Sequence, residues 1–266
     1  MITEIHHKGQ LYTIDSSRGI DLSVKNLFDG KNPAFFSANQ PSIIPVQSSE
    51  FIGDVKQGGT CNVFSASVDI HCTGTHTECI GHVNDSNIQV PDVCPSGFIF
   101  SQLISVSPET ADGTNDSYHI ELSTDLIISK HILEEKIAES HQALILRTLP
   151  NVESKKSRNY DKHPAPFFTN DAIDYLNELA IEHLLVDLPS IDKADDGGQL
   201  GNHHRFFKQG KTISELLYIS DSVSDGFGFL QIQIPNWGLD AAPSRPIFCL
   251  LYTSPSPRDR GCSRMP

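Results

Sequence analysis

The sequence predicts an α/β fold in one compact domain, with a mixed β-sheet flanked by helices, from three observations. Strand-like runs alternate with helix-like runs along the chain, which is the pattern of α/β proteins. A helix-like run is followed by a short apolar strand twice, over 129–146 and over 170–188, which indicates crossover connections and parallel pairing. Neither an internal repeat nor a domain boundary is visible, so residues 1–248 are interpreted as one domain.

The first strong strand signal lies over residues 62–70. Apolar residues alternate there with polar residues, at Phe64, Ala66, Val68 and Ile70. A period of two predicts a half-buried strand, and this strand would lead directly into His71. A second strand is expected from Gly97 to Val106.

The next elements follow in the order expected of crossover units. Ser129 is a candidate N-cap for a helix through residues 131–137, and residues 143–146 then form a short buried strand. Asn170 is a candidate N-cap for a second helix, and a strand over 184–188 follows it. The apolar face of the second helix is expected to hold Ile173, Leu176, Leu179, Ala180 and His183.

The remainder of the chain adds two strands and a long loop. The strands are expected over 213–219 and 227–234. The loop covers 151–166, and loops of this length in compact domains are often functional.

Composition and charge exclude several classes of partner. The net charge is −13 at pH 7, whereas nucleic-acid phosphates and anionic lipids attract basic surfaces. No run of about 18 apolar residues is present, and the first ten residues contain no apolar signal core. We therefore expect a cytoplasmic protein that binds neither nucleic acid nor membranes.

The end of the chain is not interpreted as native sequence. Residues 249–259 can be back-translated into a transposase sequencing adapter, and a match of this length does not arise readily by chance. We therefore expect residues 249–266 to be a non-native tail and exclude them from the domain. The other cysteines form no C-x-x-C pair, so a structural zinc ribbon is not indicated; they are Cys61, Cys72, Cys79 and Cys94.

Candidate metal ligands are concentrated in one twelve-residue segment, 71–82. Imidazole and carboxylate groups suit zinc or manganese, and a thiolate favours zinc. Taken alone, these residues are as compatible with an ordinary polar segment as with a metal site. The candidate ligands are His71, Cys72, His76, Glu78, Cys79 and His82.

The spacing within this segment requires a sharp bend. In an extended strand His76, Glu78 and His82 share one face, but six residues of strand span about 20 Å and metal–ligand bonds are about 2 Å. Gly74 and Gly81 supply places to bend. If a helix begins near Glu78 instead, its carboxylate and His82 lie four residues apart on one face.

Two further groups of polar residues are interpreted, from the residues alone, as structural features without a functional role. His203, His204 and Glu215 are interpreted as a solvated loop and a strand carboxylate. The acidic run of Asp192, Asp195 and Asp196 is interpreted as a solvated loop, although it could hold a cation.

The segment 71–82 resembles the metal-binding signature H-x-G-T-H-x-D-x-P-x-H of the cyclase family, which includes bacterial kynurenine formamidases and isatin hydrolases. Residues 74–76 and His82 match the signature, whereas Glu78 stands in place of its aspartate and Ile80 in place of its proline. The first histidine of the signature falls at Cys72. A one-residue bulge would let the preceding His71 take that role, which we prefer, and a Cys72 thiolate is the alternative.

The resemblance covers roughly residues 19–247. Residues 19–23 resemble the family's opening strand, and residues 187–192 resemble its aspartate…serine-isoleucine-aspartate turn. His203, twelve residues before Glu215, resembles the distal pair of ligands, and residues 242–245 resemble the closing proline-x-arginine.

The resemblance implies a barrel-like mixed sheet and one or two divalent ions, zinc or manganese. On the family's pattern, His71 and His76 bind one ion, and Glu78 touches or bridges both ions. His203 and Glu215 complete the second ion, and His82 is the acid/base residue. A small-molecule amide substrate and a homo-oligomer, either a dimer or a tetramer, are also implied.

Three functions are compatible with these residues. The preferred one is metal-dependent hydrolysis of carbon–nitrogen bonds in amides, formamides or cyclic amides, by metal-activated water. The second is a thiol hydrolase that uses Cys72 or Cys79 with a neighbouring histidine. The third is a metal-binding protein without catalytic activity.

Overall fold

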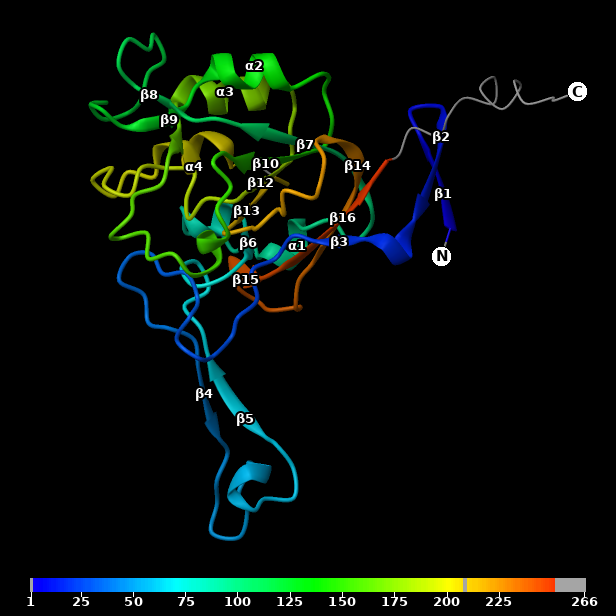
Figure 1. The fold of residues 1–266 in the computed structure, drawn as a ribbon, viewed down its shortest axis with the longest axis vertical. Helices are drawn as coiled ribbons and strands as arrows, with labels where there is room; N and C mark the ends of the chain where they lie inside the picture. The colour runs from blue at the N-terminus through cyan, green and yellow to red at the C-terminus, as the bar shows by residue number, and fades with distance from the viewer. Residues whose placement is uncertain (1, 208–209, 252–266) are drawn as a thin grey trace, which may run out of the picture.

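The computed structural model describes residues 2–207 and 210–251, and a nine-stranded sheet forms its centre (Figure 1). Strands β7, β10, β12 and β13 pair in parallel in the middle, and the pairs on either side are antiparallel. The sheet curls into a half-barrel, which confirms the predicted α/β fold with a mixed, barrel-like sheet. In spatial order the strands are β15 (Ala241–Pro243), β6 (His76–Glu78), β13 (Thr212–Glu215), β12 (His183–Val186), β10 (Ala143–Thr148), β7 (Ile99–Val106), β14 (Gly226–Gln233), β16 (Arg245–Leu250) and β3 (Ile20–Asp21).

Helices α2 and α3 cover one face of the central strands. Leu144 and Leu146 of β10 pack in one core cluster with Leu133 of α2 and Leu176 of α3. The intervening Ile145 belongs to a second cluster on the other face of the sheet. Because both faces are buried, the strand is apolar at four successive positions, 143–146, instead of alternating. The helices are α1 (Val90–Val93), α2 (Lys130–Lys136), α3 (Asn170–Glu178) and α4 (Gly201–Phe206).

Five predicted strands of the sheet are present, with shifted ends. The expected segments 97–106, 143–146, 184–188, 213–219 and 227–234 correspond to β7, β10, β12, β13 and β14. Strand β13 ends four residues before the predicted end because Leu216 adopts a left-handed backbone conformation with a φ of 55°. Its last residue is therefore Glu215, which lies in the site described below.

The two predicted helices are also present, but the N-cap residue and the apolar face predicted for the second helix differ from those in the structure. Ser129 is the N-cap residue of α2, as predicted. Helix α3 is capped by Thr169 instead of Asn170, because the Thr169 hydroxyl accepts a hydrogen bond from the Ala172 amide. The predicted apolar face was too long: α3 ends at Glu178, and His183 already belongs to β12.

The prediction of a half-buried strand over 62–70 was wrong. Strand β5 (Phe64–Ser67) pairs only with β4 (Ser42–Pro45), and all four of its residues are exposed. The pair forms a ribbon that extends away from the body of the molecule (Figure 1). Without a third strand or a helix against it, an alternating pattern buries neither face. The chain then reaches His71 through a turn, in which the Cys72 amide donates to the Asp69 carbonyl.

The ribbon, defined as residues 42–67, exposes many large apolar side chains. It contains only three charged residues, Glu50, Asp54 and Lys56. It also includes the 3-10 helix η2 (Val55–Gln57) near its far end. The exposed apolar residues are Ile43, Ile44, Val46, Ile52, Val55, Val63 and Phe64.

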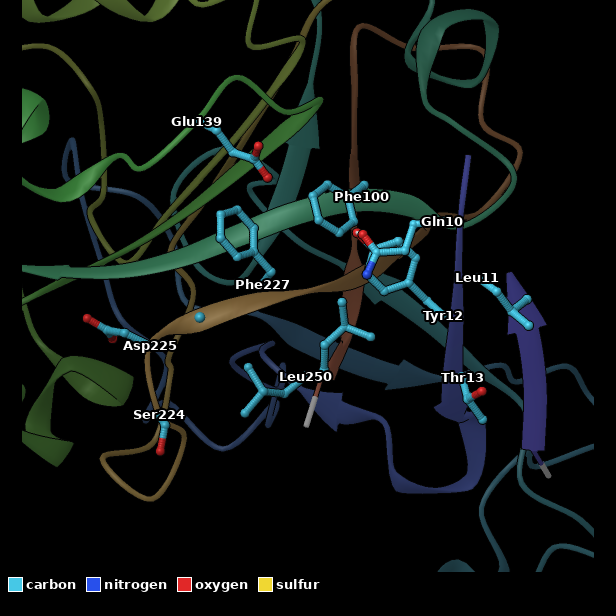
Figure 2. Close-up of a pocket in the computed structure, with 12 residues that line it drawn as sticks. Gln10, Leu11, Tyr12, Thr13, Phe100, Glu139, Ser224, Asp225, Phe227 and Leu250 are labelled. Carbon is cyan, nitrogen blue, oxygen red and sulfur yellow. The ribbon is translucent and has the colours of Figure 1, made fainter. Parts of the chain in front are cut away.

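The N-terminal hairpin lies over the opposite half of the sheet from β6. Tyr12 packs with Phe100 and Phe229. A hollow of about 850 Å³ opens between the hairpin and β7 and β14, with the stacked rings of Phe100 and Phe227 in its wall (Figure 2). The hairpin is β1 (Ile2–His7) with β2 (Gln10–Asp15), and the remaining strands are β8 (Glu109–Thr110), β9 (Leu126–Ile128) and β11 (Phe167–Phe168).

Three further 3-10 helices occur in the connections. The long loop predicted over 151–166 is present and contains one of them, so it is not wholly irregular. They are η1 (Ser16–Arg18), η3 (Ile80–His82) and η4 (Glu153–Ser157).

The boundary at residue 248 falls inside a strand. Strand β16 continues through Leu250, and Cys249 is buried. Residues 252–266 of the expected tail lie outside the described residues, and the origin of the tail stays a prediction. Within residues 2–207 and 210–251, no helix has the length and apolar character needed to cross a bilayer.

Candidate metal centre

Strand β6 is the base of a buried histidine–carboxylate cluster. It lies between β13 and β15, and all three of its residues are buried. Because side chains alternate along a strand, His76 and Glu78 share one face, and Thr77 turns to the other face to meet the Ser214 hydroxyl at 2.7 Å. Glu215 pairs directly with His76, so its carboxylate joins the same face. The Glu215 Oε2 atom lies 3.6 Å from His76 Nε2.

Helix α4 brings His203 to the cluster. Its Nε2 atom lies 3.1 Å from Glu78 Oε1 and 3.6 Å from Glu215 Oε1. On the outer side, Asp192 Oδ2 accepts hydrogen bonds from the His203 amide at 3.1 Å and from its Nδ1 at 2.7 Å. The Asp192 carboxylate therefore holds both the backbone amide and the ring of His203 in place.

His71 and His82, which precede and follow β6 in the chain, both face the Oε2 atom of Glu78. The His71 Nδ1 atom lies 2.9 Å from Glu78 Oε2, and the His82 Nε2 atom lies 3.7 Å from the same oxygen. The two rings stack with their centroids 4.2 Å apart. His82 lies four residues after Glu78, at the end of η3, so the tight turn expected after the strand is present.

Each candidate histidine ligand has its outer ring nitrogen held by an acceptor. His71 Nε2 meets Asp240 Oδ2 at 3.1 Å, and His76 Nδ1 meets the Gly74 carbonyl at 3.1 Å. His203 Nδ1 meets Asp192, as described above. An acceptor on one nitrogen keeps the proton there and leaves the lone pair of the other nitrogen free to bind a metal. The inner nitrogen of His76, Nε2, is buried and has no hydrogen-bond partner among the described residues.

The two buried carboxylates of this cluster and the imidazoles beside them shift one another's pKa values, and the Asp240 and Glu78 carboxylates raise the pKa of His71 to about 10. Burial raises the pKa of Glu215 to about 7, and the neighbouring Glu78 charge adds to this shift. Burial also acts to raise the pKa of Glu78, but hydrogen bonds from His203 and His71 outweigh it and lower that pKa well below the usual range. Two buried carboxylates that face three imidazole nitrogens match the ligand types preferred by zinc and manganese.

The structure brings together all six residues to which the resemblance assigned a role in the site, namely His71, His76, Glu78, His82, His203 and Glu215. His71, His76 and Glu78 form one group of donor atoms within 4.8 Å of one another, and Glu78, His82 and His203 form a second. Glu78 belongs to both groups, and Glu215 spans between His76 and His203. The residues therefore fit one ion or two adjacent ions.

Cys72 is not part of this cluster. Its side chain packs against the apolar cluster that contains Phe35, Tyr160 and Leu216. Burial raises the pKa of the Cys72 thiol to about 11, with a further contribution from the Asp69 charge. Of the two candidates for the first position of the signature, the structure therefore places His71, and not Cys72, beside Glu78.

The interpretation of Asp192 and Asp196 as solvated acids was wrong, because both side chains are buried. Asp196 accepts hydrogen bonds from three backbone amides, those of residues 198, 199 and 200. It also meets His119 Nε2 at 3.2 Å. His119, Asp192 and Asp196 form a further group of possible metal ligands, but these hydrogen bonds already occupy the carboxylates. Asp195 is exposed, as predicted.

Asp240 is a member of the site that the sequence interpretation missed. It immediately precedes β15, and it contacts both His71 and His82. Its only signal in the sequence is its position beside the segment 242–245 that resembles the family's closing proline-x-arginine. Nothing in that segment alone shows that it meets β6.

Comparisons with known proteins agree with this fold and with the resemblance. Kynurenine formamidase of Bacillus thuringiensis (strain Al Hakam) is 28% identical over 193 residues, which cover 72% of this chain and 82% of that protein. Kynurenine formamidase of Bacillus anthracis is 27% identical over 201 residues, which cover 75% and 86%.

Solved structures share the fold at lower identity. Isatin hydrolase A from Labrenzia aggregata, bound to benzyl benzoate, has a TM-score of 0.61 at 15% identity, covering 88% of this chain and 94% of that chain. A structure described as a "Potential Metal-Dependent Hydrolase With Cyclase Activity" has a TM-score of 0.61 at 19% identity, covering 87% and 98%. The model of the family described as "Putative cyclase" matches residues 20–193, more than half of the chain, and this chain therefore belongs to the cyclase family.

Proposed function

We propose that this protein is a metal-dependent hydrolase of carbon–nitrogen bonds in amides, formamides or cyclic amides. The observation that carries the proposal is the convergence of histidine and carboxylate donor atoms around the buried, unpartnered Nε2 of His76. The names of the relatives, kynurenine formamidase and isatin hydrolase, support amide-type substrates.

His71, His76, Glu78, His203 and Glu215 hold the divalent ion or ions in this proposal, and zinc and manganese are the candidates. When bound, such an ion supplies Lewis acidity and lowers the pKa of a water ligand to about 7. Glu78 shares one donor group with His71 and His76, and its Oε1 atom lies 3.1 Å from His203 Nε2, which supports an arrangement of two ions. Glutamate in place of the family's aspartate adds one methylene, so the carboxylate reaches further from β6.

His82 moves the proton in this proposal. Its Nε2 faces Glu78, and a quarter of its side chain is open to solvent. Burial lowers its pKa, so the ring is neutral at neutral pH and can accept a proton at Nε2. It can then return that proton to the leaving nitrogen, since general acid–base catalysis requires a group within hydrogen-bond reach of the proton.

The thiol hydrolase is the weaker candidate. A nucleophilic cysteine needs a lowered thiol pKa, whereas burial raises the pKa of both Cys72 and Cys79. The Cys79 sulfur lies 3.6 Å from the Ile88 carbonyl oxygen and is fully buried.

The test uses purified protein with an N-formyl arylamine and an isatin-like lactam as probe substrates. We expect hydrolysis of at least one probe, its loss after chelation, and its recovery with zinc or manganese. His76→Ala should abolish it, whereas His183→Gln, which changes a buried histidine outside the site, should not. Activity that survives chelation and disappears on thiol alkylation would support the cysteine hydrolase instead. Stoichiometric metal without turnover would support a non-catalytic role.

We also propose that the chain is a homo-oligomer in which the ribbon packs against a second copy. A two-stranded ribbon is at best marginally stable alone, and this ribbon exposes seven large apolar side chains. The chain carries a net charge of −13, and the ribbon is a nearly neutral surface that brings few like charges together at a contact between two copies. Light scattering should show that wild type is a dimer or tetramer. The double variant Ile44→Lys and Phe64→Lys should be a monomer. An unchanged mass would refute the assignment.

A further inference from the structure

Asp240 lies at the open side of the cluster, with about a third of its side chain exposed. Its Oδ2 atom is 3.1 Å from His71 Nε2 and 3.5 Å from His82 Nδ1. Glu78 Oε2 meets the other nitrogen of each ring, at 2.9 Å and 3.7 Å. The two stacked rings are therefore held between an inner carboxylate and an outer one.

The backbone fixes Asp240 in this place. Strand β15 pairs with β6 so that Ala241 lies opposite Glu78, and the Cys79 amide donates to the Asp240 carbonyl at 3.0 Å. On the other side, a Cβ atom at Gly81 would lie 3.1 Å from the Asp240 Cβ and 2.6 Å from the Ile88 carbonyl oxygen. The turn between Glu78 and His82 can approach Asp240 this closely because residue 81 is glycine.

We propose that Asp240 is a positioning residue that orients His71 as a metal ligand and His82 as the proton carrier. This inference rests on the proposed function for the roles of the two rings. By accepting from His71 Nε2, the carboxylate leaves Nδ1 directed toward Glu78. By facing His82 Nδ1, it leaves Nε2 directed toward the same oxygen. One side chain thus supports both rings, and metal binding and proton transfer depend on it together.

The experiment compares wild type with Asp240→Ala, Asp240→Asn and the control Asp85→Ala, which removes an exposed acid three residues after His82. The first measurement is an absorption titration with Co²⁺. We expect Asp240→Ala to weaken Co²⁺ affinity about 10- to 100-fold without changing the number of ions bound. Asp240→Asn should remain within a few-fold of wild type because its amide oxygen still accepts, and Asp85→Ala should match wild type.

The second measurement needs no metal. In the metal-free protein, a hydrogen-bonded Nε2–H of His71 should give a low-field proton resonance. That resonance should be retained in Asp240→Asn and lost in Asp240→Ala. The spectrum also reports whether each variant is folded.

The outcomes separate this inference from the proposed function. Wild-type Co²⁺ affinity in Asp240→Ala, or the same weakening in Asp240→Asn as in Asp240→Ala, would overturn the positioning role. Loss of one bound ion in Asp240→Ala would make Asp240 a ligand and overturn it as well. If wild type binds no Co²⁺, the proposed function fails, and the resonance of His71 still supports or refutes the orientation of that ring by Asp240.

Discussion

The candidate site has a buried inner half and a half-open outer half, and the two are built differently. His76, Glu78, His203 and Glu215 are each at most 4% exposed, and regular strands or a helix supply them. The outer residues His71, His82 and Asp240 are 25–34% exposed and come from a turn, the end of η3 and the residue before β15. The inner half contains two buried carboxylates, whereas the outer half is the part of the site that is open to solvent. Binding and proton transfer are therefore expected to respond to different substitutions.

The largest effect is expected from Glu78→Gln in the inner half. This carboxylate faces every histidine of the site, so its loss should remove metal binding and, with it, several kcal/mol of transition-state stabilisation. Activity on a formamide or lactam probe should fall about 10⁴-fold. Dialysis followed by elemental analysis checks the metal content, and the exposed Glu121→Gln is the matched control. Retention of both metal and activity would show that the inner half is not the binding site.

His82→Ala in the outer half is expected to separate the two roles. Turnover should fall about 10³-fold, the usual scale of general acid–base catalysis, while the number of bound ions and the metal affinity stay near those of wild type. Steady-state kinetics and a metal titration on the same sample check this. Equal loss of metal and turnover would place His82 among the ligands and remove the distinction between the halves.

Asp192→Ala tests whether the hydrogen bonds from His203 to Asp192 contribute to metal binding by the inner half. It removes the carboxylate that accepts from both the backbone and the ring of His203, so metal affinity should fall about 10- to 100-fold. Asp192→Asn should lose less, because the amide oxygen still accepts one of these bonds. If Asp192→Ala binds metal as tightly as wild type, His203 needs no such support.

His183→Gln is expected to have the smallest effect on the site, because His183 is a buried histidine outside the cluster whose Nδ1 atom lies 2.9 Å from the Thr212 hydroxyl oxygen. Burial lowers its pKa from 6.5 to about 4, so the unfolded chain binds one more proton between these values. Its contribution to stability is complete above about pH 6.5 and is lost as the pH falls toward 4, by about 3 kcal/mol. Denaturant unfolding at both pH values should show that the free energy of unfolding changes less with pH in the variant than in wild type. Metal binding should be unchanged. If the free energy of unfolding changes equally with pH in the two proteins, the buried, neutral state of His183 is contradicted.

The sequence predicted the inner half better than the support around it. Strand β6 carries two of its ligands within three residues, and the resemblance supplied His203 and Glu215. Asp240 was missed because its contact with His71, 169 residues away in the chain, depends on the pairing of β15 with β6. Pairing over such a distance leaves no local pattern.

The two errors in burial have a common physical origin. Residues 62–70 alternate like a half-buried strand, yet the ribbon meets no second layer, so both faces stay exposed. Asp192 and Asp196 are acidic residues yet buried, and backbone amides donate hydrogen bonds to their oxygens. In both cases the neighbours that decide burial lie far away or belong to the backbone, and residue type alone does not reveal them.

Metal content tests the central claim most directly. Wild-type protein and His76→Ala would be dialysed against zinc or manganese, passed through a desalting column and analysed for bound ion per chain. We predict one or two ions per chain for wild type and a clear loss for the variant, with circular dichroism showing that the variant remains folded. Wild type without a stoichiometric ion, or equal content in the two proteins, would contradict the assignment of this cluster as a metal centre.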